Sequence, residues 1–325
     1  MLLAAACALA GCGGGSSATP SRMSSAATAR AGARARGHGA GPGAVAVRAT
    51  RVGTLPAPVQ LPAVTALSGR QAVALAGLDA ADVSTTGAFA LTARGARRLP
   101  SLPAAVHDAA AATVGGHAYL FGGGSASGEV ATILRLGASG ATRVGTLPAP
   151  ASDAAAATIG STAYVVGGYT GKTPLRSILA FRPGRPIRDV GTLPRPLRYA
   201  AVTAVGGALL IAGGTSGVTP VRDVLRFDPA TRRVRRIARL ASPLTHASAA
   251  SWNGRMLVIG GRGASLASQT ARILSVDPAT GRVRVAGHLP VALSDTGAAR
   301  IDQGVLVAGG RDSSGRVHDA LWLLR

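Results

Sequence analysis

Cysteine and aromatic residues are scarce in this chain, and each shortage excludes one way of holding or using a fold. Cys7 and Cys12 are the only cysteines among the 325 residues, and both lie near the amino terminus. No disulfide can therefore tie later parts of the chain together. Phe, Trp and Tyr make up 3% of the sequence, which leaves few of the stacking platforms that single-stranded nucleic acid requires. We expect strand pairing to close the structure.

Acidic residues and lysine are also few. The chain has 13 Asp and Glu against 35 Lys and Arg, a formal net charge of +22, and Lys172 is the only lysine. Arginine in place of lysine, beside abundant alanine and glycine, is typical of a GC-rich genome. A positive field concentrates polyanions, but the arginines are scattered and are never interleaved with aromatic residues. We expect a solvated basic surface and no specific nucleic-acid partner, with polyanion recognition as the alternative.

The amino-terminal apolar run, Leu2 to Gly11, is too short to span a bilayer as a stable helix. Its end, Leu9-Ala10-Gly11-Cys12, resembles the lipobox of bacterial lipoproteins. The resemblance implies that residues 1–11 are a signal peptide and that Cys12 is lipidated and holds the protein on the outer side of a membrane. Residues 12–44, rich in Gly, Ser, Ala and Arg, are predicted to be a flexible linker. The alternative is an apolar tail with an incidental cysteine.

A glycine doublet recurs every 45 to 49 residues in the rest of the chain. Its copies are Gly122-Gly123, Gly167-Gly168, Gly213-Gly214, Gly260-Gly261 and Gly309-Gly310, with Ala76-Gly77 as a degenerate first copy. The phrase VGTLPAP at Val52 returns at Val144 and, as VGTLPRP, at Val190. Two markers with one period indicate an array of a single supersecondary unit.

Each repeat is predicted to form four antiparallel strands. In the repeat from Asp153 to Pro196, we expect strands at 154–159, 163–166, 177–181 and 187–193, separated by turns that contain Gly and Pro. Such units close best into a radial propeller, because each sheet then has a neighbour on both faces. The alanine-rich first strands fit the narrow inner ends of the blades.

Three further phrases point to a family: YVVGG from Tyr164, FDPAT from Phe227, and the "LP" that ends the fourth strand. They resemble kelch repeats over residues 45–325, although apolar or basic residues such as Val190, Val234 and Val283 replace the usual Trp of the fourth strand. Counting repeats gives an all-β, six-bladed propeller of four-stranded antiparallel blades. The last repeat lacks a fourth strand, which we expect Val45 to Thr54 to supply by pairing with the carboxy-terminal blade.

The spacing of the doublets also predicts a candidate site. In an up-and-down blade, the loop before the first strand and the loop after the doublet fall on one face. Fourteen residues before each doublet, an alignment without gaps gives Pro62, Asp108, Asp153, Tyr199, His246 and Asp295. With the adjacent positions, the candidate ligand-binding residues are His107, Asp108, Asp153, Tyr169, Arg198, Tyr199, His246, Arg262, Asp295 and Arg311. Blade one offers only apolar residues here. The alternative is that each Asp or Ser satisfies local backbone donors.

No metal-ligand spacing, phosphate loop or dinucleotide fingerprint accompanies these residues, so we expect no cofactor and no metal. A copper oxidase of the kelch type is excluded because the repeats contain no cysteine. The six-bladed sialic acid mutarotases are similar in fold only. We expect an extracytoplasmic, membrane-anchored, monomeric module that binds a protein or carbohydrate ligand of the cell envelope without catalysis. The alternatives are a carbohydrate-active enzyme using Asp108 or Asp153 with His246 or Tyr199, and a purely structural envelope protein.

Overall fold

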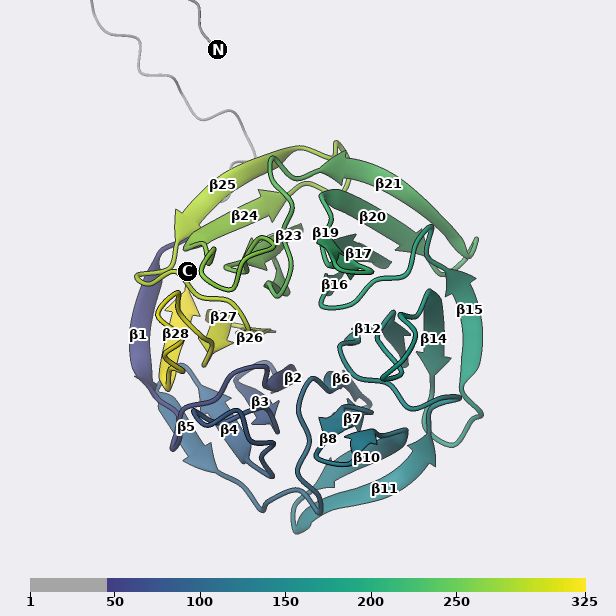
Figure 1. Cartoon of the computed structure of the whole chain (residues 1–325), viewed down its shortest axis with the longest axis vertical. Coiled ribbons are helices and arrows are strands. Elements are labelled where there is room, and N and C mark those ends of the chain that lie inside the picture. Colours follow the sequence, from purple (N-terminus) through teal and green to yellow (C-terminus); the bar gives the residue numbers. More distant parts are fainter. Residues whose placement is uncertain (1–45) are drawn as a thin grey trace, which may run out of the picture. The chain divides into compact units, whose positions relative to one another are not determined.

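Six four-stranded antiparallel sheets surround one axis in the computed structural model, which describes residues 46–325 (Figure 1). The predicted all-β, six-bladed propeller is confirmed. The predicted signal peptide, the lipidation site Cys12 and the linker lie outside the described residues. Within residues 46–325, no helix is long and apolar enough to cross a bilayer.

The first three blades follow one another along the chain. Blade one consists of β2 (Ala63–Ser68), β3 (Gln71–Leu75), β4 (Ala88–Thr92) and β5 (Gly95–Arg98). Blade two consists of β6 (Ala110–Val114), β7 (His117–Phe121), β10 (Thr132–Gly137) and β11 (Gly140–Thr146), with a small hairpin of β8 (Gly124–Ser125) and β9 (Gly128–Glu129). Blade three consists of β12 (Ala155–Ile159), β13 (Thr162–Val166), β14 (Ser177–Phe181) and β15 (Arg188–Thr192). The ends of blade three differ from the predicted ones by one residue at most.

The last three blades repeat this order. Blade four consists of β16 (Ala201–Val205), β17 (Ala208–Ala212), β20 (Asp223–Asp228) and β21 (Arg233–Arg239), with a small hairpin of β18 (Thr215–Ser216) and β19 (Thr219–Pro220). Blade five consists of β22 (Ser248–Trp252), β23 (Arg255–Ile259), β24 (Arg272–Val276) and β25 (Val283–His288). Blade six consists of β26 (Gly297–Ile301), β27 (Gly304–Ala308), β28 (Ala320–Leu324) and β1 (Ala49–Thr54).

The outermost strand of blade six comes from the opposite end of the sequence. β1 pairs antiparallel with β28, from Ala49 opposite Leu324 to Thr54 opposite Ala320. The buried side chains of Val47 and Leu55 flank this strand and pack into neighbouring hydrophobic clusters. β28 therefore has no free edge, and the first and last described segments hold each other in place.

Apolar burial is greatest in the second strand of each blade. Leu209, Leu210 and Ile211 of β17 have no exposed surface, whereas most residues of the outer strand β11 are exposed. The first strands, which face the axis, are built mainly of Ala, Thr and Val. Small residues fit there because neighbouring sheets converge toward the axis, and the larger aliphatic residues fill the widening space between blades.

The glycine doublets lie at the contacts between blades. The second glycine of each doublet donates its N–H to a carbonyl in the segment that enters the next blade, as Gly214 does to Leu244 at 2.9 Å. The first glycine, Gly213, has a φ of +62°, and a Cβ there would overlap the same Leu244 carbonyl. The doublet therefore recurs because each copy attaches one blade closely to the next.

Candidate functional site

The loops that enter the first strands lie beside the loops that follow the doublets, as predicted. Antiparallel bridges join His107 to Gly124, Ser152 to Tyr169, Arg198 to Thr215, Thr245 to Arg262 and Ser294 to Arg311. In this way the fold brings the polar residues of both loops to one face of the propeller. We call it the entrance face.

A ring of backbone hydrogen bonds surrounds the axis on this face. The N–H groups of Asp153, Tyr199, His246 and Asp295 each donate to the carbonyl of the corresponding residue one blade earlier, starting at Asp108, at 2.8 to 3.2 Å. Leu61 donates in the same way to Asp295 at 2.7 Å. All six residues have positive φ, between 51° and 62°. This shared conformation brings their side chains to the axis.

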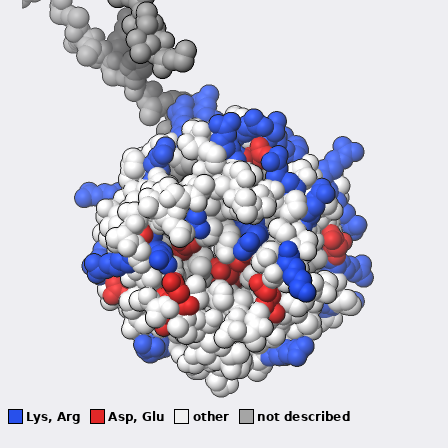
Figure 2. Space-filling model, viewed as in Figure 1, with Lys and Arg blue, Asp and Glu red and all other residues white. Residues whose placement is uncertain are grey.

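The side chains of the ring line an axial pocket of about 100 Å³. The lining residues of this axial pocket include Leu61, Asp108, Asp153, Tyr199, His246 and Asp295, with an alanine, proline or threonine after each of them. Figure 2 shows acidic and basic side chains together around the middle of this face. The pocket is smaller than the 300–1,000 Å³, roughly, of pockets for drug-sized ligands, so it can take only part of a larger ligand.

Blade one departs from the ungapped alignment by one residue. The alignment predicts Pro62 at the ring position, but Leu61 has the ring conformation and Gln60 takes the preceding position. The extra residue is accommodated where the register of β2 against β3 shifts, between Ala66 and Ser68. The prediction that blade one offers only apolar residues is therefore wrong, because Gln60 is polar and buried.

Asp153 is held by a buried ion pair. The Arg198 Nε donates to Asp153 Oδ2 at 2.5 Å, and the side chains are 25% and 2% exposed. The guanidinium also lies 3.9 Å from the centre of the Tyr169 ring, a cation–π contact. Three of the predicted residues thus form one unit, in which the aromatic ring and the carboxylate fix the arginine at the pocket edge.

Tyr199 and His246 form a stacked aromatic pair, with ring centres 3.7 Å apart. Arg262 Nη2 lies 3.1 Å from His246 Nε2, and His246 Nδ1 lies 3.0 Å from Thr245 Oγ1. Because the guanidinium can only donate, Nε2 accepts and Nδ1 carries the proton. Burial, together with the charges of Arg262 and Arg198, lowers the pKa of His246 well below its usual range. The imidazole is therefore neutral.

Asp295 has one carboxylate oxygen with a partner and one without. Ser294 Oγ donates to Oδ2. Oδ1 is buried and has no hydrogen-bond partner among residues 46–325. A buried acceptor of this kind can take a hydrogen bond from water or from a bound ligand, and leaving it unpaired costs about 1–3 kcal/mol. This oxygen is a candidate acceptor for a ligand in the pocket.

The three pocket carboxyl groups hold protons more tightly than ordinary aspartates do. Burial, reinforced by the charges of Asp153 and Asp295, raises the pKa of Asp108 well above its usual value. Burial also raises the pKa of Asp153, although Arg198 opposes this. Burial raises the pKa of Asp295 too, against a hydrogen bond from Ser294. Asp108 is thus the carboxyl group best placed to keep a proton, and Asp153 has the closest cation.

Five of the ten predicted residues do not line the axial pocket: His107, Tyr169, Arg198, Arg262 and Arg311. His107 Nδ1 lies 2.8 Å from Ser84 Oγ, and Arg311 Nη1 donates to Asp82 Oδ1 at 3.2 Å. Asp82 Oδ1 also accepts a hydrogen bond from Gln60 Nε2 at 2.5 Å. These partners were not predicted from the sequence, because they lie in blade one, either after its degenerate doublet or at the ring position that is shifted by one residue.

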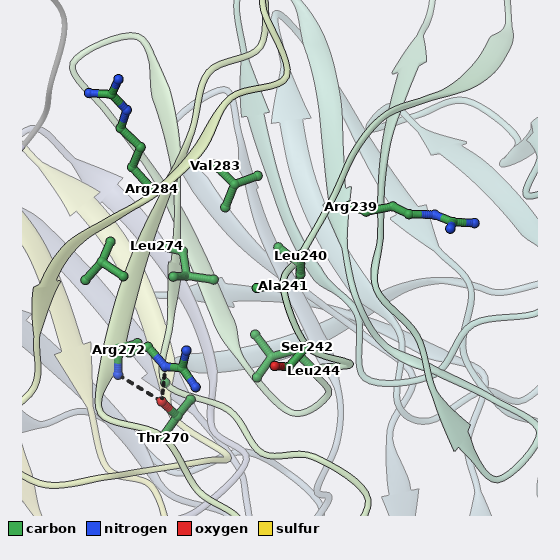
Figure 3. Close-up of a pocket in the computed structure, with 12 residues that line it drawn as sticks. Arg239, Leu240, Ala241, Ser242, Leu244, Thr270, Arg272, Leu274, Val283 and Arg284 are labelled. Carbon is green, nitrogen blue, oxygen red and sulfur yellow. Dashed lines mark hydrogen bonds between the residues drawn. The ribbon is translucent and has the colours of Figure 1, made fainter. Parts of the chain in front are cut away.

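Other cavities of the propeller differ in character from the axial pocket. A cavity of about 330 Å³ runs between the six inner strands and is lined mostly by Ala, Thr and Val, with Arg300 as its one charged lining residue. Another, of about 270 Å³, lies between blades four and five (Figure 3). There Leu240, Leu274 and Val283 lie around the cavity, while Arg239 and Arg284 extend away from it. Among residues 46–325, no three His, Cys, Asp or Glu side chains are arranged to hold a metal ion.

Comparison with known proteins supports the fold. The kelch motif matches residues 150–184 and 196–241, which correspond to blades three and four. The solved structure of YjhT aligns with a TM-score of 0.72 and 15% sequence identity, over 84% of this chain and 99% of that one. No protein with a curated description matches the sequence. At this identity, the likeness to YjhT concerns the fold alone.

Proposed function

Because two of the six blades carry kelch motifs, we propose that this kelch-type propeller is a binding module, and that its axial pocket recognises a hydroxyl-rich group of a cell-envelope glycan. The observation that carries the proposal is the convergence of three buried carboxyl groups beside a stacked tyrosine and histidine. Sugar hydroxyls donate readily to carboxylates, and sugar rings pack against aromatic faces. The pocket volume of about 100 Å³ suits one edge of one sugar unit.

The unpaired oxygen of Asp295 gives the proposal its specific test. We expect Asp295→Asn to weaken glycan binding about tenfold, because a buried acceptor lost from a ligand contact costs about 1.5 kcal/mol or more. Asp302→Asn is the matched control, since Asp302 is exposed in the turn between β26 and β27. Binding is measured by saturation-transfer NMR over panels of neutral and acidic sugars. No binding by the wild-type protein in any panel would contradict the proposal.

A second candidate, a carbohydrate-active enzyme, is favoured by one observation. Asp108 has the most strongly raised carboxyl pKa of the pocket, and Asp153 is paired with Arg198. A carboxyl group with a raised pKa, beside one that is paired with a cation, offers the components of general acid and base catalysis. Epimerisation or mutarotation needs such a pair, because one group delivers a proton to the sugar while the other removes one.

Exchange NMR distinguishes the two candidates. An enzyme of this kind accelerates anomeric exchange or bond cleavage in a sugar that it binds, and Asp108→Asn abolishes the acceleration while the sugar still binds. A binding module leaves the exchange rate at its uncatalysed value in both proteins. The wild-type rate therefore decides between the candidates, and the variant identifies the acid.

We also propose that the propeller is anchored to the outer side of the cell membrane through Cys12, because this cysteine ends a lipobox-like sequence. Cys12→Ser should move the protein from the membrane fraction to the soluble fraction of the expressing bacterium. A matched change at Cys7, which lies inside the proposed signal peptide, should leave the protein in the membrane fraction. Membrane retention of the Cys12 variant would count against the anchor.

A further inference from the structure

A groove lined by arginines lies between blades three and four, on the face opposite the axial pocket. Its volume is about 400 Å³. We call it the arginine groove, after Arg182, Arg185, Arg188 and Arg232. These residues lie in or beside the turns β14–β15 and β20–β21. In the antiparallel blades these turns stand at the other ends of the strands from the doublets, so the groove and the axial pocket are separate sites.

Within residues 46–325, the four guanidinium groups of the groove have no acidic partners. No Asp or Glu lines the groove, and none of its four arginines forms an ion pair within residues 46–325. Eight other arginines within residues 46–325 do form ion pairs, and Asp223 alone contacts Arg195, Arg236 and Arg239. Four like charges around one groove repel each other, and a bound anion would relieve that repulsion.

At the position that Arg182 occupies in blade three, blade five has an acidic residue. In blade five, Asp277 follows the third strand, accepts N–H bonds of its own turn and pairs with Arg255 at 2.9 Å. The strand register places Arg182 at the same position in blade three, opposite Thr162. Arg182 Nε donates to Thr162 Oγ1 at 2.6 Å. The scaffold therefore does not require a cation here, and the arginine is held by a hydrogen bond that leaves its charge unneutralised.

We propose that the arginine groove binds a ligand that carries at least two phosphate groups. Guanidinium groups bind phosphate through two parallel N–H bonds, which makes arginine the preferred residue for such anions. The volume of about 400 Å³ exceeds what one phosphate fills and lies in the usual range for ligand pockets. Tyr164, Val190, Pro186 and Pro229 supply apolar walls for the carbon atoms between the phosphates.

The test uses the full-length protein and two probes. Inorganic tripolyphosphate is titrated by calorimetry, and vesicles of phosphatidylcholine with cardiolipin, whose headgroup carries two phosphates, are sedimented with the protein. We compare Arg185→Gln/Arg188→Gln with the control pair Arg97→Gln/Arg143→Gln, which removes the same charge from the exposed strands β5 and β11. The side chains of Arg185 and Arg188 make no hydrogen bond within residues 46–325, so thermal melting should show that the groove variant folds.

We expect the groove variant to bind tripolyphosphate at least about tenfold more weakly, since two charge-assisted contacts are lost, while the control pair stays within about twofold of the wild type. Loss of vesicle binding by the same variant identifies a phospholipid headgroup as the source of the phosphates, and unchanged vesicle binding identifies a soluble ligand. Wild-type affinity of the groove variant for both probes would overturn the proposal, as would an equal loss in the control pair.

Discussion

Removal of Arg198 should reveal how strongly the axial pocket depends on one buried ion pair. Arg198→Met keeps much of the side-chain volume but strands Asp153, whose side chain is 2% exposed. The carboxylate then either stays charged, at about 3–5 kcal/mol, or takes up a proton. Protonation costs about 1.4 kcal/mol for each pH unit above its pKa.

Protonation of Asp153 limits the loss of stability in Arg198→Met, and this limit depends on pH. Because burial raises the pKa of Asp153 above the ordinary value, protonation costs at most about 4 kcal/mol at pH 7 and about 1.5 kcal/mol at pH 5. Loss of the cation–π contact with Tyr169 adds about 1 kcal/mol at either pH. Arg198→Met should therefore lower the free energy of unfolding by up to about 5 kcal/mol at pH 7 and about 2.5 kcal/mol at pH 5.

Urea unfolding followed by tryptophan fluorescence at the two pH values measures this difference. The matched variant is Asp153→Asn, which leaves Arg198 with a guanidinium that still reaches water, since its side chain is 25% exposed. Its cost should be smaller, about 1–2 kcal/mol, and nearly the same at both pH values. The reasoning fails if Arg198→Met costs the same at pH 5 and pH 7, or if Asp153→Asn costs as much as Arg198→Met at pH 7.

Three further perturbations test the fold and the pocket. Because the pKa of Asp108 is raised in the folded state, this carboxyl group stabilises the protein below its unfolded pKa and loses that effect as pH rises through the folded pKa. In thermal melts, Asp108→Asn should therefore gain stability relative to the wild type as pH rises, and a constant difference would contradict this. Gly213→Ala should cost several kcal/mol, whereas Gly206→Ala, also at positive φ but with open space for a Cβ, should cost about 1 kcal/mol; equal losses in thermal melts would be incompatible with the blade contact. A chain that starts at Gly43 should stay monomeric in size-exclusion chromatography, whereas one that starts at Leu55 exposes the edge of β28 and should aggregate; two monomers would refute this.

The fold was predictable because its markers are backbone requirements. Gly213 and its counterparts are needed wherever one blade contacts the next, so the period of the doublet reports the number of blades directly. For five blades, the doublet predicted the position of the ring residue correctly. It failed in blade one, where a strand irregularity between Ala66 and Ser68 shifts the count and nothing in the residue types signals it.

Which residues form the site was easier to predict from the sequence than the contacts that those residues make. Sequence spacing placed Asp153 and Arg198 near one another, but it cannot show that the pair is buried or that Tyr169 lies against the guanidinium. The unpaired oxygen of Asp295 depends on packing around a single atom. The arginine groove was hidden for a different reason. Arg232 lies far in the sequence from Arg182, so arginines that appear scattered along the chain gather only when two blades meet.

The backbone conformation of the ring residues supports a role of their side chains in ligand binding. All six ring positions have φ between 51° and 62°, a conformation that glycine adopts freely and that costs bulky residues about 1 kcal/mol or more. The chain uses glycine for this purpose at the doublets, yet it places Tyr199 and His246 at two ring positions. Leu61 shows that the fold imposes the conformation whatever the side chain is. The strain at Tyr199 and His246 is thus tolerated where glycine would relieve it, and those two rings are stacked in the pocket that we assign to the ligand.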